Sequence, residues 1–295
     1  MLVPTLLRNY FEGHLGKKRT DSPRVAKIAI VRLNSHFKRK HLSDITQADV
    51  DAYCETRKPN APATTRRELS VLIAAAHWNV RARNIAATEI PLIDLPPASP
   101  TKDVWLTREQ AMRLLAAAAR RASHHDRGWR IQLFIMLGLF TGQRPNVIRY
   151  LKWSKIDMEK QILDFTKDTD TGKKRYGRVK AMPELWPAIE EAYEKRWYRG
   201  EHWVLGMTTA LEDEFRKVVA DAALPKAITP NIMRHTWATW AVQDEVPLAH
   251  VAGVLGSTVA IVEKKYAHHD PEYQDRATNR RIFAQPISGP DADLF

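Results

Sequence analysis

Three short segments in the second half of the chain combine a cation with a helix boundary signal. The first runs from Thr141 to Ile148, where Gly142 is typical of a helix end and Arg144-Pro145 of a helix start. A guanidinium at this place lies beside backbone N–H groups that lack helical partners, and both attract anions. Taken alone, the segment favours an ordinary turn that carries a solvated arginine.

The second segment runs from Thr229 to Thr236. Thr229 is a good N-cap and Pro230 suits the first helical position. Asn231 and Arg234 are three residues apart, so they share a helical face close to the positive end of the helix dipole. The segment therefore predicts a phosphate site.

The third segment contains Tyr266, directly after Lys264 and Lys265. A single tyrosine is far more often a packing residue than a nucleophile. Two adjacent lysines, however, favour a nearby phosphate and help to stabilise a phenolate. Tyr266 is therefore a candidate nucleophile.

Together the segments resemble the tyrosine recombinase, or phage integrase, family, and the resemblance covers most of the chain. Members carry a T-G-x-R box, a lysine on a β-hairpin, an H-x-x-R-H-T box, an L-G-H segment and a final R/K-Y-A-H. The matching stretches here are T-G-Q-R ending at Arg144, N-I-M-R-H-T with Arg234, L-G-S ending at Ser257 and K-K-Y-A-H with Tyr266. Their order and relative spacing agree, which is more specific than any single box.

The resemblance implies a site-specific recombinase that transfers a phosphoryl group without a metal or other cofactor. Tyr266 would attack a DNA phosphodiester, form a 3′-phosphotyrosyl link and expel a 5′-hydroxyl. Arg144 and Arg234 would stabilise the charge that grows on the non-bridging oxygens. The acid for the leaving oxygen would be Lys167, just before the turn between the second and third predicted strands. Lys173 and Lys174, in the same predicted hairpin, are alternatives.

Two positions depart from the family pattern. Asn231 replaces the first histidine of H-x-x-R-H-T, and Ser257 replaces the histidine of L-G-H. Both side chains still hydrogen-bond phosphate oxygens, but neither is a general base near neutral pH, so we expect slower catalysis. In the family the position of His235 is structural, and we expect His268 and His269 to order the local structure.

The composition favours a polyanionic partner. The 295 residues include 46 Lys and Arg against 34 Asp and Glu, a net charge of +12. Residues 1–95 hold 16 basic and 9 acidic side chains, and residues 96–295 hold 30 and 25, so both parts are basic. Lysines and arginines near phosphates release counterions, although a merely soluble basic protein has the same balance.

Other features favour a cytoplasmic protein. Cys54 is the only cysteine, which excludes a disulfide within one chain and favours a reducing compartment. The apolar stretch from Ile131 to Phe140 is too short to span a bilayer. Pro4, Arg8 and Asn9 leave no apolar region of a signal peptide.

Prolines divide the chain. Residues 1–95 are predicted to form a helical, SAM-like core DNA-binding domain, 96–103 a Pro-rich linker, 104–285 the catalytic domain and 286–295 an irregular tail. In the first domain we expect an apolar stripe of Val25, Ile28, Ala29 and Leu33. Helices are expected at Asp44–Tyr53, capped by Thr46, and at Ala63–Val80. The candidate DNA-binding side chains are Lys38, Arg39, Lys40, Arg66 and Arg67.

The second domain is predicted to be mainly α with a small antiparallel sheet. The expected strands are Ile156–Asp157, Ile162–Phe165 and Arg178–Met182. The expected helices are one capped by Thr107, then Trp129–Phe140, Glu184–Arg199, Leu211–Ala223, Asn231–Val242 and Leu248–Leu255.

The partner expected from the resemblance is duplex DNA, bound by a homotetramer with accessory DNA-bending proteins as further partners. The segment past Tyr273 either docks on a neighbouring protomer or is a frayed end. One alternative function is a regulatory DNA-binding relative that has lost turnover, which Asn231 and Ser257 favour. Another is a basic helical protein that binds RNA, which competition between duplex DNA and RNA would distinguish.

Overall fold

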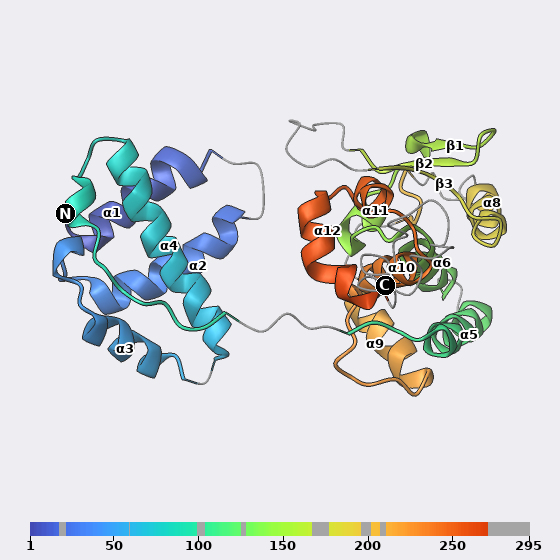
Figure 1. The fold of residues 1–295 in the computed structure, drawn as a ribbon, viewed down its shortest axis with the longest axis horizontal. Helices are drawn as coiled ribbons and strands as arrows, with labels where there is room; N and C mark the ends of the chain where they lie inside the picture. Colours follow the sequence, from blue (N-terminus) through green and yellow to red (C-terminus); the bar gives the residue numbers. More distant parts are fainter. Residues whose placement is uncertain are drawn as a thin grey trace, which may run out of the picture. The chain divides into compact units, whose positions relative to one another are not determined.

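The chain forms two compact units, Met1–Lys102 and Asp103–Phe295, in a computed structural model (Figure 1). The structure describes residues 1–17, 22–58, 60–98, 104–124, 128–166, 177–195, 202–206 and 211–270. Buried apolar residues form a separate core cluster in the first unit and two clusters in the second.

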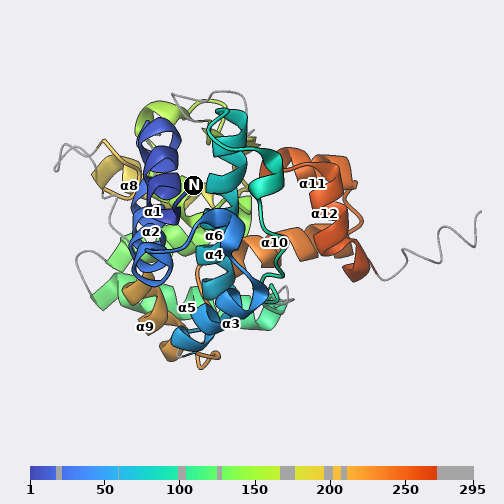
Figure 2. The ribbon, with the colours of Figure 1, turned by 90° about the vertical axis from the view of Figure 1, so that its left-hand side faces the viewer.

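The first unit is helical, and α4 packs against α1 and α2 (Figures 1 and 2). A single core holds these helices together, and Leu6, Leu33, Leu69 and Leu72 are fully buried in it. The elements are α1 Val3–Tyr10, a π-helical turn Phe11–Leu15, α2 Ser22–Phe37, a 3₁₀ turn Leu42–Asp44, α3 Gln47–Thr56, α4 Pro62–Arg81 and a 3₁₀ turn Ala87–Glu89.

The predicted cap of α3 is confirmed, but the predicted start is wrong. Thr46 and Asp49 form a reciprocal capping box, so the helix begins at Gln47 rather than at Asp44. Asp44 lies instead in the 3₁₀ turn before the cap. The helix starts where the Thr46 side chain satisfies an N–H group that has no partner within the helix.

The predicted apolar stripe of α2 is partly wrong. Val25 and Ile28 are 47% and 51% exposed, whereas Ala29 and Leu33 are buried as expected. The helix is apolar on more than one side, because Ala26, Ile30 and Phe37 also carry apolar side chains and are buried. Packing against α1 and α4 decides which apolar residues face the core, and the sequence period alone does not.

Part of the predicted linker is bonded to the first unit. The backbone N–H of Asp94 donates to Gln47 Oε1 at 2.8 Å. Arg66 Nη1 donates to the carbonyl oxygens of Leu95 at 3.3 Å and Pro96 at 2.5 Å. These bonds hold residues 94–96 against α3 and α4.

The second unit combines helices with a three-stranded antiparallel sheet in the order β1-β2-β3 (Figure 1). Ile156 pairs with Leu163, and Leu163 pairs with Val179. The strands are β1 Ile156–Asp157, β2 Ile162–Asp164 and β3 Arg178–Lys180. The helices are α5 Arg108–His124, α6 Gly128–Thr141, α7 Pro145–Arg149, α8 Trp186–Lys195, α9 Glu212–Asp221, α10 Ile232–Gln243, α11 Leu248–Leu255 and α12 Val259–Tyr266, with 3₁₀ turns η4 Trp153–Lys155 and η6 Ala267–His269.

These elements confirm the predicted fold class, mainly α with one small antiparallel sheet. Thr107 caps α5 as expected, since its hydroxyl accepts from the Gln110 N–H at 3.1 Å. The second and third strands end earlier than predicted, at Asp164 and Lys180, which is ordinary scatter at element ends.

The apolar helix α6 lies at the centre of the second unit. It packs against α5 and α10, and its buried residues occur on all sides of the helix, as its composition predicts. Gly138 permits the close approach of α10, because a Cβ there would lie 2.5 Å from the Met233 sulfur. Burial of α6 therefore fixes the position of its C-terminal end at Thr141.

Glu68 joins three helices of the first unit. This 4% exposed carboxylate accepts from Tyr53 Oη at 2.6 Å, from Arg57 at 2.9 and 3.0 Å, and from Arg32 Nη1 at 2.5 Å. Burial alone would raise the pKa of Glu68, but these hydrogen bonds lower it below its ordinary value. Burial and the same carboxylate raise the pKa of Tyr53, so the phenol stays a donor.

We expect Glu68→Gln to destabilise the first unit by about 3 kcal/mol, because it removes the charge that pairs two arginines. Hydrogen exchange of the α3 and α4 amides in the full chain measures this loss. The folded pKa of Glu68 lies below the unfolded one, so its contribution is present above about pH 4.3. The contribution is lost as the pH falls through the folded pKa.

The matched control is Glu55→Gln, since Glu55 makes only an exposed pair with Lys58. Such pairs contribute about 0–1 kcal/mol. Equal protection of α4 in the two variants would contradict the assigned role of Glu68.

Candidate active site

The predicted cation segment after α6 is a tight turn. Gly142 has φ +64°, and its N–H donates to the Gly138 carbonyl at 3.1 Å. Arg144 is the N-cap residue of α7, with Pro145 directly after it, as predicted. A Cβ on residue 142 would lie 2.7 Å from the Trp237 ring, so both backbone conformation and space require glycine here.

Side chains tie this turn to α10 and α11. Arg234, on α10, donates from Nη1 to the Gly142 carbonyl at 3.1 Å and from Nη2 to the Leu255 carbonyl at 3.0 Å. Gln143 Nε2 donates to the Val254 carbonyl at 2.6 Å. Three segments that are far apart in the sequence are thereby fixed at one place.

Arg144 brings a donor to this place that can bind an anion. Its Nη1 atom is buried and has no hydrogen-bond partner among the described residues. A buried charged donor without a partner costs more than the 1–3 kcal/mol or so of a neutral one. A phosphate oxygen would satisfy this donor with the geometry that guanidinium groups favour.

Tyr266 ends α12 and is 6% exposed. Its hydroxyl lies 3.0 Å from Nδ1 of His235. Burial raises the pKa of Tyr266, while the positive charges of Arg234 and Arg144 lower it. The structure therefore brings Arg144 and Arg234 within electrostatic range of Tyr266, as the sequence predicts.

Asn231 and Ser257 lie at the ends of helices in the same region. Asn231 is the exposed N-cap residue of α10, and its side chain makes no capping hydrogen bond. The prediction that Thr229 caps this helix, with Pro230 at its first position, is wrong. The Thr229 carbonyl instead accepts from the Ile232 N–H at 2.8 Å, so a backbone turn precedes the helix. Ser257 follows the left-handed Gly256 at the end of α11.

The predicted hairpin lysines, Lys167 and the alternatives Lys173 and Lys174, lie outside the described residues. Residues on both sides of this segment, Phe165 and Gly177, are described. The Phe165 N–H donates to the Gly177 carbonyl at 3.3 Å. Gly177 lies against α11, since a Cβ there would approach the carbonyl oxygens of Val254 and Gly253 to 3.0 and 3.1 Å. Gly177 is therefore next to α11, the helix that Gln143 also contacts.

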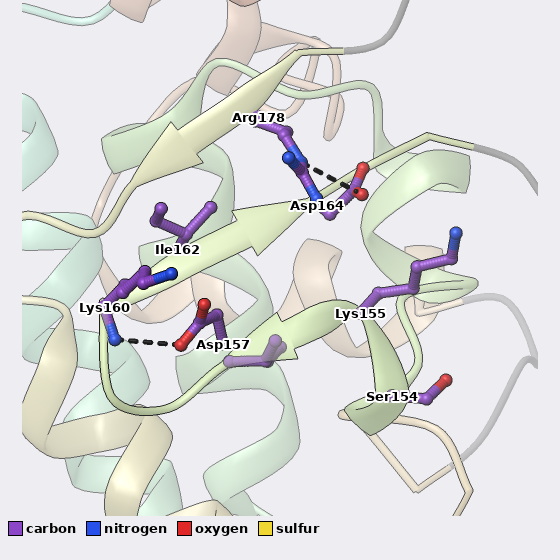
Figure 3. Close-up of a pocket in the computed structure, with 8 residues that line it drawn as sticks. Ser154, Lys155, Asp157, Lys160, Ile162, Asp164 and Arg178 are labelled. Carbon is purple, nitrogen blue, oxygen red and sulfur yellow. Dashed lines mark hydrogen bonds and ion pairs between the residues drawn. The ribbon is translucent and has the colours of Figure 1, made fainter.

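The sheet borders a second polar surface, a hollow of about 430 Å³ (Figure 3). Three cations line it, namely Lys155, Lys160 and Arg178. Asp164 accepts from Arg178 Nε at 3.3 Å, and Asp157 accepts from the Lys160 N–H at 2.9 Å. With two carboxylates among its cations, this hollow is a weaker anion site than the Gly142 turn.

The predicted DNA-binding cations of the first unit differ in their contacts. Lys38, Arg39 and Arg67 are exposed. Lys40 pairs with Asp49 at 2.8 Å and helps to lower the pKa of that carboxyl to about 2. Arg66 is half-buried and bonded to residues 95 and 96.

Two residues of the site were not predicted as functional from the sequence. Gln143 fills the variable position of the T-G-x-R box, and His235 was expected to be structural. No sequence signal marks the bond from Gln143 to Val254, because it joins residues 111 positions apart. Among the described residues, no group of three or more His, Cys, Asp or Glu side chains is placed to hold a metal ion. No described helix has the length and apolar character needed to cross a membrane.

We expect Gly142→Ala to destabilise the second unit by more than the 1–2 kcal/mol or so of a left-handed L-residue, since the new Cβ also overlaps Trp237. Thermal unfolding of the full chain, with hydrogen exchange at the end of α6, measures the loss. Gly253→Ala is the matched control. A Cβ at this helical position meets nothing within 4 Å, so the free energy of unfolding of that variant should rise by up to about 1 kcal/mol. Equal stabilities would contradict the tight fit at Gly142.

Several solved structures share this fold. The integrase of transposon Tn1549 in complex with transposon right end DNA has a TM-score of 0.76 and 17% identity, over 96% of this chain and 99% of that one. XerH site-specific recombinase bound to palindromic difH substrate, a post-cleavage complex, has a TM-score of 0.69 and 16% identity, over 95% of each chain. A lambda integrase dimer bound to a COC′ core site has a TM-score of 0.66 and 15% identity, over 88% of this chain and 97% of that one.

Comparison of the sequence with protein families identifies the family, which similarity of fold alone does not. No curated protein matches the chain. Residues 104–273, however, match the phage integrase family. This stretch is more than half of the chain and includes Arg144, Arg234 and Tyr266. The chain therefore belongs to the phage integrase family, the tyrosine recombinases.

Proposed function

We propose that the chain is a site-specific DNA recombinase that cleaves and rejoins duplex DNA through a 3′-phosphotyrosyl intermediate. The observation that carries the proposal is the convergence of Tyr266 with the guanidinium groups of Arg144 and Arg234. A nucleophile beside two guanidinium groups, one of them with an unsatisfied buried donor, fits the needs of an in-line attack on a phosphodiester.

In the proposed step, Tyr266 Oη forms a bond to phosphorus and the bond from phosphorus to the 5′ oxygen breaks. Arg144 and Arg234 stabilise the charge on the non-bridging oxygens, the electrostatic contribution that usually dominates catalysis. Lys167 protonates the departing 5′ oxygen. Asn231 and Ser257 donate hydrogen bonds that position the phosphate.

Duplex DNA is the proposed substrate and partner. The net charge of +12 favours a polyanion, and structures of similar fold are complexes with DNA. The exposed cations Lys38, Arg39 and Arg67 suit phosphate contacts of the first unit, with Lys40 and Arg66 beside them. Family membership favours four protomers on two DNA sites, with strands exchanged in pairs and accessory DNA-bending proteins as further partners.

A second candidate function is a regulatory DNA-binding protein with little or no turnover. Asn231 and Ser257 favour it, since both stand where the family has histidines. Lost acid–base assistance costs a factor of about 10²–10⁴ in rate, which still permits slow catalysis. The two functions make opposite predictions for a covalent adduct.

We expect wild-type protein to form a covalent adduct with a nicked duplex, and Tyr266→Phe to form none. The probe is a library of nicked duplexes that includes DNA flanking the gene of this protein, analysed on a denaturing gel. The control is Tyr150→Phe, because Tyr150 is exposed and outside the site. Tight duplex binding without an adduct in wild type would favour the regulatory function instead.

We expect Arg144→Lys to slow adduct formation about 10²–10³-fold at saturating protein, because lysine cannot reproduce bidentate guanidinium geometry. The measurement uses a duplex recovered from the trapping experiment. Arg149→Lys is the matched control on the same helix, where Arg149 donates to Asn146 at 3.0 Å. A wild-type rate in Arg144→Lys would argue against transition-state stabilisation by Arg144.

A further inference from the structure

We propose that His235 is the catalytic base that takes the proton from Tyr266, in place of the histidines that Asn231 and Ser257 replace. This inference rests on the proposed function and assigns it a further residue. The observation that carries it is the 3.0 Å distance between Tyr266 Oη and His235 Nδ1.

Packing holds the two side chains in this arrangement. His235 lies on α10, whose next residue, Thr236, is fully buried and accepts from the Leu106 N–H at 2.9 Å. Trp240 Nε1 donates to the Leu106 carbonyl at 3.1 Å. Tyr266 is fixed by its burial among residues of α10 and α11. The ring centroids of His235 and Tyr266 are 5.9 Å apart and tilted by 51°, so the groups meet at their polar atoms rather than by stacking.

The hydroxyl of Tyr266 needs a proton acceptor. The Tyr266 residue is largely buried, so a neighbouring side chain is better placed than bulk water to remove the proton. Asn231 and Ser257 have no basic atom near neutral pH. Neutral imidazole has one, and histidine is the usual general base in enzymes. Among the contacts that the structure describes, His235 is the group at hydrogen-bond distance from this hydroxyl.

Positive charges dominate the surroundings of this pair. Arg234 precedes His235, and Arg144 faces Tyr266 from the turn after α6. The other charged or titratable side chains near α10, on elements packed against it or at its C-terminal end, are Arg130 of α6, His250 of α11, Glu263, Lys264 and Lys265 of α12, His268 and His269 of η6, and the pair Arg108–Asp244. Positive charge from two nearby arginines opposes the protonation of an imidazole, so it favours the neutral form that a base requires.

The proton balance is closed. In cleavage, the Oη–H proton moves to His235 Nδ1 while Oη bonds to phosphorus and the 5′ oxygen departs with a proton from Lys167. In rejoining, a 5′-hydroxyl gives its proton back to Lys167 and attacks phosphorus, and the Tyr266 oxygen departs. That oxygen takes the proton back from His235. The imidazolium formed in the first step is therefore the acid of the second.

The first test measures adduct formation by His235→Asn on a nicked duplex. Asparagine retains an acceptor near the position of Nδ1 but no base. We expect the rate to fall about 10²–10⁴-fold. We also expect the pH dependence of the wild type between about pH 5 and 8, where histidine ordinarily titrates, to be lost. Wild type should lose rate as the pH falls, because protonated imidazole accepts no proton.

A substrate with sulfur in place of the bridging 5′ oxygen separates the two proton transfers. Sulfur departs without an acid, so it should restore a Lys167→Ala variant but leave the defect of His235→Asn. His250→Asn is the matched control, since His250 is an exposed histidine of α11. We expect a wild-type rate and pH profile from it. Thermal unfolding checks that each variant is folded.

A second readout needs no DNA. Nitrogen NMR of labelled histidine in the full chain should show His235 as the Nε2–H tautomer, with Nδ1 unprotonated at neutral pH. An Nδ1–H tautomer, or a slow His235→Asn variant that keeps the wild-type pH profile, would overturn the inference and leave the proposed function standing. Wild-type protein that forms no adduct at any pH would overturn both.

Discussion

Arg234 donates hydrogen bonds to two backbone carbonyls, at Gly142 and Leu255, and these bonds join the turn after α6 to the end of α11. Gln143 adds a third link between the same segments. The rest of the site depends on this junction, because it fixes the backbone on which Arg144 and Ser257 stand. A guanidinium with its orientation set before substrate arrives loses little entropy when it binds a phosphate.

The junction requires a turn that only glycine makes readily. Gly142 adopts a left-handed conformation against the Trp237 ring, and Gly138, one turn earlier, lets Met233 approach α6. The segments of the candidate site therefore follow a buried helix whose spacing to α10 is set by a small residue. In the first unit, Glu68 has a comparable role, since this buried carboxylate of α4 binds donors from α2 and from the C-terminal end of α3.

The positions of Asn231 and Ser257 indicate what the two departures from the family pattern mean for the chemistry of the site. Asn231 is exposed at the start of α10, and Ser257 follows the end of α11. Both are suited to hydrogen bonds with phosphate oxygens and not to proton transfer. The proposed base, His235, lies on the same helix as Arg234. One helix would then supply both a positive charge for the phosphate and an acceptor for the nucleophile's proton.

The sequence by itself determined the fold class and most helix positions, because helix boundary residues act locally. The order of the motifs, through the resemblance to the family, predicted the grouping of Arg144, Arg234 and Tyr266. What the sequence did not predict depends mostly on partners distant along the chain. The buried face of α2 and the bonds of Arg66 to residues 95 and 96 are of this kind. The start of α10 differs, since a local backbone turn at Thr229 moves the helix start to Ile232. The contact of His235 with Tyr266 joins residues 31 positions apart. Only tertiary packing decides such contacts, since it selects among several faces and partners that satisfy the same local pattern.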